Sequence, residues 1–282
     1  MLRRVATWVC LSGVVILGAC AAPLLTPALQ ARLETLLPAD ALLVGEQHDT
    51  PAHQQLHREL VSALAAKGQL AAVALEMAEQ GRSTDALEPG ASESTVRAAL
   101  QWDDATWNWA AYGPAVMAAV RAGVPVRGAN LTPAQRTAAL NNTTLDALLR
   151  GPALKAQQQR IRIGHCGLLP ESQITPMTRV QIARDVAMAQ TLTTATVPGK
   201  TVLLLAGSGH VDATLGVPQH LPPDFRAKTL LLYANTASTA PETIANFDQS
   251  WPTPPPAAEK DYCAQLQALP QQNPNAGSAL PS

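Results

Sequence analysis

The sequence predicts an α/β fold, with a central sheet of parallel type that helices cover on both faces. Short apolar runs alternate along the chain with segments of helical periodicity, which is the order of elements in such sheets. The runs are apolar on both alternations, as buried parallel strands are. The expected strands lie at 41–44, 71–75, 124–126, 201–206 and 229–233. The expected helices lie roughly at 52–67, 92–100, 105–122, 132–149 and 173–195.

Composition excludes several classes of protein. The chain has 282 residues, of which 47% are hydrophobic and 15% charged, so it is large and apolar enough to bury a core and is not intrinsically disordered. The formal net charge is −1, so there is no basic field for nucleic acid. Four cysteines are too few for a disulfide-built scaffold. We see no apolar run for a second membrane span, which excludes a polytopic membrane protein.

The first residues predict export and a lipid anchor. Met1 to Ala19 has a basic start, a short apolar stretch and small residues before Cys20, as a secretory signal peptide does. The sequence Leu-Gly-Ala-Cys at 17–20 resembles the lipobox of bacterial lipoproteins, which implies cleavage and acylation at Cys20. Alanine rather than aspartate follows that cysteine, which favours the periplasmic side of the outer membrane by the sorting rule of enteric-type bacteria.

The rest of the chain divides into a tether, one domain and a tail. Residues 20–38 form the lipidated cysteine and its tether, and residues 39–250 form the α/β domain. A mostly helical insertion at about 131–196 separates the third and fourth strands. Residues 251–282 are rich in proline and polar residues, and we expect a mobile tail. Cys166 and Cys263 could pair in an oxidising compartment, but spacing alone does not show that they are close.

Polar side chains follow four of the expected strands. Glu46 and His48 follow the first strand and Glu76 ends the second. Asn130 follows the third strand and His210 the fourth. In open α/β sheets, ligands bind beyond the carboxyl ends of the strands, so these residues are candidates for metal binding, acid–base chemistry or carboxylate recognition. The alternative is structural, because acids also cap helices and histidines also serve as satisfied core residues.

Two further groups have a structural and a functional interpretation. His53 and His57 stand four residues apart on an expected helix, and without a nearby glutamate of the zinc-protease type we expect a solvent-facing pair. Aromatic residues are scarce, yet four of them gather within eleven positions: Trp102, Trp107, Trp109 and Tyr112. They form either a packing cluster or the wall of a site for a flat apolar ligand, with a phenol available.

Together these motifs resemble the ChaN family of haem-binding lipoproteins associated with iron uptake. The matching motifs, in chain order, are Val44 to Asp49, Leu75 to Met77, Trp107 to Tyr112, Gly128 to Leu131, His165 to Gly167, Gln181 to Ala189 and Gly207 to Val211. The resemblance spans about residues 40–235. Each motif is weak alone, but seven in order are specific, and the lipobox agrees with them independently.

The resemblance implies an α/β fold, a haem cofactor and a homodimer that encloses two haems face to face. It also implies tyrosine coordination of the haem iron with histidine nearby, and service to an outer-membrane haem or iron receptor. We expect Tyr112 to be the iron ligand, with Tyr233 and Tyr262 as the other candidates. The expected haem-binding set is completed by His48, His165, His210 and Trp109.

A second resemblance points to catalysis. The paired Gly-x-x-His frames also resemble the wider Tiki and erythromycin-esterase group, whose members are hydrolases that use Glu and His, some with a metal. Under that interpretation the periplasmic catalytic site would consist of Glu46, His48, Glu76 and His210. Arg184 and Asp185, from the helical insertion, would complete it.

Overall fold

The computed structural model describes residues 25–235, 244–257 and 261–268. The predicted signal peptide, Cys20 and the start of the tether lie outside the described residues. No helix in the described part of the chain is long and apolar enough to cross a membrane.

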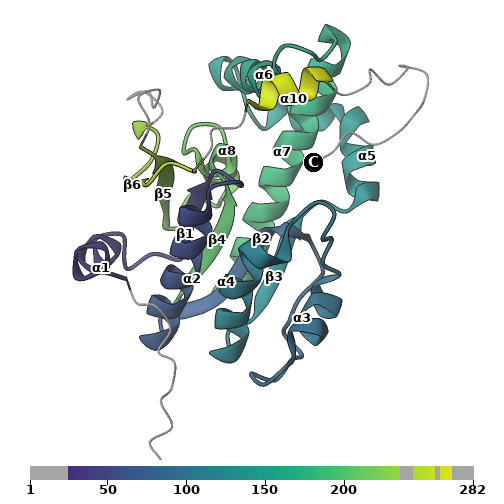
Figure 1. The fold of residues 1–282 in the computed structure, drawn as a ribbon. Coiled ribbons are helices and arrows are strands. Elements are labelled where there is room, and N and C mark those ends of the chain that lie inside the picture. Colours follow the sequence, from purple (N-terminus) through teal and green to yellow (C-terminus); the bar gives the residue numbers. More distant parts are fainter. Residues whose placement is uncertain (1–24, 236–243, 258–260, 269–282) are drawn as a thin grey trace, which may run out of the picture.

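The described chain folds into a six-stranded sheet and surrounding helices (Figure 1). The strands are β1 Ala41–Glu46, β2 Leu70–Glu79, β3 Val126–Asn130, β4 Thr201–Gly207, β5 Ala227–Ala234 and β6 Gln249–Thr253. The α-helices are α1 Pro27–Glu34, α2 Pro51–Ala66, α3 Glu93–Leu100, α4 Trp109–Arg121, α5 Pro133–Asn141, α6 Pro152–Gly164, α7 Glu171–Ala195, α8 Ser208–Val211 and α10 Tyr262–Ala268. Two 3-10 turns are η1 Thr143–Ala147 and η2 Val217–His220.

All neighbouring strands are parallel, in the order β3-β2-β4-β1-β5-β6, which confirms the predicted fold class. The chain places β4 between β1 and β2, so the carboxyl ends of these three strands adjoin. In the β1–β4 ladder Glu46 pairs with Gly207, which brings the first and fourth strand ends level. The predicted insertion is also confirmed, because α5, η1, α6 and α7 all lie between β3 and β4.

Two apolar layers hold the helices on the sheet. Alternate side chains of the buried strands, such as Leu42 and Leu205, pack with residues of α2 and α4 on one face. Their neighbours, such as Leu43 and Leu204, pack on the other face with Met188 of α7. Both faces are therefore covered, which explains why the strands are apolar on both alternations.

Apart from α1 in the predicted tether, five elements lie outside the predicted helix and strand ranges: the short turns α8 and η2, helix α6, and then β6 and α10. The last two lie in or at the edge of the stretch predicted to be a tail. The predicted solvent-facing pair is wrong, because His53 and His57 are both fully buried in α2.

Candidate functional site

The polar strand ends meet in one site at the carboxyl edge of β1, β2 and β4. Glu46 ends β1, Glu76 lies in β2, and His210 stands in α8 directly after β4. The Gly207 amide at the end of β4 donates to Glu76 Oε2 at 2.7 Å. A Cβ at Gly207 would lie 2.8 Å from His48 Nε2, so glycine permits the close approach of β4 to the other two strand ends.

His210 is held between two carboxylates. Its Nδ1 lies 2.5 Å from Asp185 Oδ1 of α7, and its Nε2 lies 3.2 Å from Glu76 Oε1. Burial opposes a charge on His210, but the negative charges of Glu76 and Asp185 outweigh it and raise the pKa of His210 to about 10. Burial likewise favours a neutral Glu76, yet the charges of His210 and His48 hold its pKa far below the usual value. The site therefore contains a buried imidazolium–carboxylate chain at neutral pH.

Glu46 is the centre of a second set of hydrogen bonds. Its Oε1 lies 2.9 Å from His48 Nδ1 and accepts from the Tyr112 hydroxyl at 2.8 Å, while Oε2 accepts from Gln54 at 2.7 Å. Burial and the negative charge of Glu46 raise the pKa of Tyr112. Tyr112 is thus a buried, protonated donor that orients Glu46.

His48 connects the two sets and faces solvent. Its Nε2 lies 3.6 Å from Glu76 Oε2, and 38% of its side chain is exposed. Burial alone would lower the pKa of His48, but the negative charges of Glu76 and Glu46 together have the larger effect and raise it. His48 is therefore the part of the polar chain that a ligand in solution can reach.

A cavity of about 780 Å³ opens beside His48, within the range usual for ligand and cofactor sites, about 300–1,000 Å³. We call it the strand-end cavity. Its lining consists of Gln47, His48, Asp49, Pro51, Gln54, Glu76, Thr106, Trp107, Asn108, Ala111, Tyr112, Asn130, Arg184 and Tyr262. The Arg184 Nε atom is buried and has no hydrogen-bond partner in the structure. Arg184 as a residue lines the cavity, and the positive charge of its guanidinium is suited to a carboxylate of a ligand.

Three residues predicted to bind a ligand do not line this cavity. Trp109 is buried in the core against Trp102, and Trp107 lines the cavity instead, with its ring centroid 4.9 Å from that of His48. His165 ends α6, where its Nδ1 lies 2.8 Å from the Ile161 carbonyl oxygen. His210 is buried behind Glu76 and likewise does not line the cavity.

Sequence reasoning missed the place of Tyr262, the first residue of α10, which lines the cavity although it lies more than 200 residues from His48 in the chain. Its hydroxyl donates to a carboxylate oxygen of Asp49. A disulfide between Cys166 and Cys263 joins the turn after α6 to α10. The signal available in the sequence was the possible cysteine pair, because a bond there would bring Tyr262 next to the insertion.

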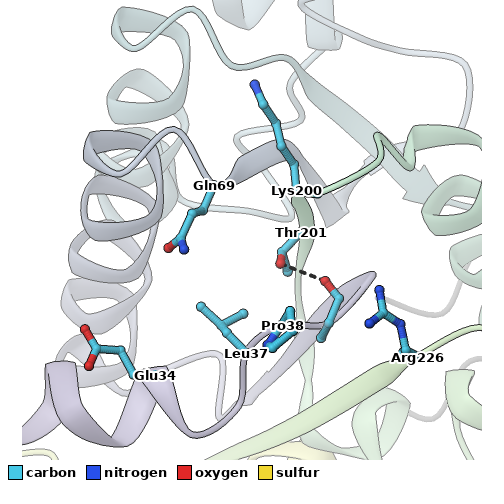
Figure 2. A pocket seen from close by; sticks show the side chains of 9 residues that line it. Glu34, Leu37, Pro38, Gln69, Lys200, Thr201 and Arg226 are labelled. Carbon is cyan, nitrogen blue, oxygen red and sulfur yellow. Dashed lines mark hydrogen bonds between the residues drawn. The ribbon is translucent and has the colours of Figure 1, made fainter.

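Among the described residues, no group of three or more His, Cys, Asp or Glu side chains is arranged to hold a metal ion. The carboxylates and histidines instead pair with one another. A smaller hollow of about 270 Å³ lies at the opposite, amino-terminal edge of the strands (Figure 2). There the Thr201 hydroxyl donates to the Ala39 carbonyl at 2.8 Å, and Arg226 pairs with Asp40, so these polar groups are engaged in holding the fold.

Comparison with known proteins gives one family match and several similar solved structures. The profile of a family described as haem-binding uptake, Tiki superfamily, ChaN, matches residues 32–221. Among solved structures, ChaN of Campylobacter jejuni, described with cofacial haem binding, is similar with a TM-score of 0.59 and 23% identity. The match covers 73% of this chain and 86% of that one.

Two more distant structures are also similar. The type III effector HopBA1 has a TM-score of 0.41 and 16% identity, covering 71% of this chain and 80% of its own. A Bacillus cereus protein has a TM-score of 0.43 and 14% identity, covering 73% and 68% respectively. No curated protein sequence matches this chain.

Proposed function

The chain belongs to the ChaN family of the Tiki superfamily, described as haem-binding uptake proteins, and from this premise we propose that it binds ferric haem in the strand-end cavity. Haem is the cofactor that the sequence resemblance implies. The observation that carries the proposal is a cavity of about 780 Å³ lined by Trp107, two tyrosines and Arg184.

Each lining group suits one part of a haem. Trp107 and Ala111 offer apolar surface to the porphyrin face, whose removal from water favours binding. Arg184 lines the cavity and offers its guanidinium charge to a propionate, and a charge-assisted bond of this kind is among the stronger ones in proteins. His48 is exposed beside them and supplies the nearby histidine that the resemblance implies.

Two tyrosines of the cavity are candidates for the axial ligand of the iron. Tyr112, the ligand expected from the sequence, is 3% exposed, and its hydroxyl donates to Glu46, so ligation would break a buried hydrogen bond. Tyr262 is 49% exposed, so haem iron can replace its surface hydrogen bond to Asp49 without disturbing the core. Position therefore favours Tyr262. A phenolate is an anionic ligand that proteins use for haem iron.

The proposal extends to cellular context. We propose that Cys20 carries lipid, that the protein is held at the outer membrane, that haem is enclosed between two copies of the chain, and that an outer-membrane haem or iron receptor is the partner. These statements are supported by the lipobox-like sequence at 17–20 and by family membership.

The test is titration of the mature protein with haemin, followed by absorbance. We expect a high-spin ferric spectrum with a phenolate charge-transfer band, which Tyr262→Phe removes and Tyr112→Phe retains. Loss of the band in Tyr112→Phe alone would assign the ligand to Tyr112.

Arg184→Gln should weaken haem binding about tenfold, or about 1.4 kcal/mol. Arg226→Gln is the matched control, because Arg226 pairs with Asp40 at the opposite, amino-terminal edge of the sheet. Absence of haem binding in the wild type would overturn the proposal.

One observation favours a second candidate, a periplasmic Glu/His hydrolase. The series of ion pairs Asp185–His210–Glu76 extends to His48 at the cavity. Buried charges arranged in this way shift the pKa values of side chains into the range that acid–base catalysis needs. A screen of ester and amide substrates would test it. Glu76→Gln should abolish any hydrolysis found, whereas the haem carrier requires no turnover at all.

A further inference from the structure

The helix α10 is held at the mouth of the strand-end cavity with little packing of its own. Every described side chain of α10 is exposed except Leu266, which is partly buried. A helix of seven residues is not stable alone in water. Its place must therefore come from the bonds that tie it to the body of the protein.

Two bonds of different strength tie α10 in place. The Tyr262 hydroxyl donates to Asp49 in the loop after β1, and this bond is open to competing water. Cys263, the next residue, is covalently joined to Cys166 across 97 residues of chain. In Figure 1, α10 lies beside α6, above the end of α7, where this covalent bond places it.

Cys166 forms this bond from a tight turn that ends α6. Cys166 has a φ of +57°, the left-handed region that residues other than glycine rarely adopt, and Gly167 follows with +69°. The reversal follows the end of α6, and Cys166 forms the disulfide from this turn. The conformation belongs to the end of α6, because the Gly167 amide donates to the Arg162 carbonyl and the Cys166 amide donates to the Ile163 carbonyl.

We propose that the Cys166–Cys263 disulfide is a positioning bond for haem binding: it keeps Tyr262 at the mouth of the strand-end cavity, so that its reduction loosens the hold on haem. This inference rests on the proposed function. Reduction breaks the S–S bond and consumes two electrons and two protons, supplied by a dithiol that is itself oxidised to a disulfide. Haem retention then depends on the redox state of the compartment.

The test compares the mature protein with its Cys166→Ser/Cys263→Ser variant in haemin titrations without reductant. We expect the paired serine variant to bind haemin at least tenfold more weakly. Tyr262→Ala should cause a similar loss with the disulfide intact. Combining all three substitutions should add little, because both changes remove the same interaction.

Two further measurements separate positioning from general stability. In the haem-free protein, hydrogen exchange of residues 261–268 should become fast when the disulfide is absent, while exchange in β1 and β4 stays slow. A dithiol added to the haem-loaded wild type should release haem, and the paired serine variant should not respond to it.

The outcomes are distinguishable. A wild type that does not bind haemin overturns the proposed function and this inference with it. A wild type that binds, with equal binding by the paired serine variant, overturns the inference alone. Additive losses from the serine pair and Tyr262→Ala would also overturn it, because the disulfide would then act through something other than Tyr262.

Discussion

At the scale of single residues, the protonation of His210 makes the stability of the folded protein depend on pH. Its pKa is raised from 6.5 to about 10 by Glu76 and Asp185, against the opposing effect of burial. A raised pKa in the folded state contributes stability that is present in full below about pH 6.5 and is lost as the pH rises through about 10. A tenfold change in proton affinity between the folded and unfolded states is worth about 1.4 kcal/mol, so the loss amounts to a few kcal/mol.

We therefore predict that the melting temperature of the haem-free protein falls steadily between pH 7 and 10. The variant His210→Gln should be less stable at pH 7 and should show a shallower alkaline decline, the remainder coming from His48, whose pKa is also raised. Asp185 does not titrate between pH 7 and 10, because burial raises its pKa only to about 6. Thermal unfolding followed by circular dichroism checks the prediction, and equal slopes in the two proteins would contradict it.

At the scale of elements, Gly128 explains the Gly-Ala-Asn motif at the end of β3. A Cβ there would lie 2.0 Å from the Glu79 carbonyl oxygen, because β2 and β3 approach closely where their register shifts. Two residues later, the Asn130 side chain donates to the Glu76 carbonyl at 2.9 Å and so supports the site. The close approach positions Asn130 beside Glu76.

We predict that Gly128→Ala destabilises the protein by about 3 kcal/mol or more, since the added methyl would clash with backbone that cannot move freely. Gly90→Ala is the matched control, because nothing lies within 4 Å of a Cβ at that position. Chemical denaturation of both variants measures the difference. A Gly128→Ala protein as stable as the control would show that the two strands can separate there at no cost.

At the same scale, some features of the fold could be predicted from the sequence and others could not. The strand-end residues Glu46, Glu76 and His210 could be brought together from sequence, because continuous apolar runs mark buried parallel strands and their ends meet. No such run marks β6, an edge strand that contains Pro252. His57 was expected to face solvent because no glutamate of the zinc-protease type stands near it in sequence, but its Nδ1 is buried 3.9 Å from Glu46 Oε2. Contacts of this kind depend on the tertiary fold.

At the scale of the whole molecule, the lipobox-like sequence at 17–20 predicts a lipid anchor at Cys20. We predict that Cys20→Ser leaves a precursor that is neither labelled by palmitate nor found with the outer membrane. Labelling and membrane fractionation of the wild type and the variant check this. Palmitate labelling of the variant at wild-type level would contradict lipid attachment at Cys20.

Exposed apolar side chains flank the disulfide at the end of the molecule where the cavity opens. Ile163 at the end of α6 is 66% exposed, and Leu168 in the following turn is 48% exposed. A bound haem would add its own apolar face to this surface, and a second copy of the chain would remove both from water. The energetic gain grows with the apolar area covered, so haem and a second subunit should favour each other's binding.

We therefore predict that haemin shifts the protein from monomer to dimer, and that the double variant Ile163→Glu/Leu168→Glu shifts it back at equal haem loading. Val197→Glu is the control, because Val197 is also exposed but stands just before β4, at the opposite edge of the sheet. Size-exclusion chromatography with light scattering gives the masses. A dimer that persists in the double variant, or that is lost equally in Val197→Glu, would place the subunit contact elsewhere. In a dimer, the double variant would bury two glutamates without partners, which costs free energy, whereas the glutamate of Val197→Glu would stay in water. The dimer should therefore be weakened in the double variant and not in the control.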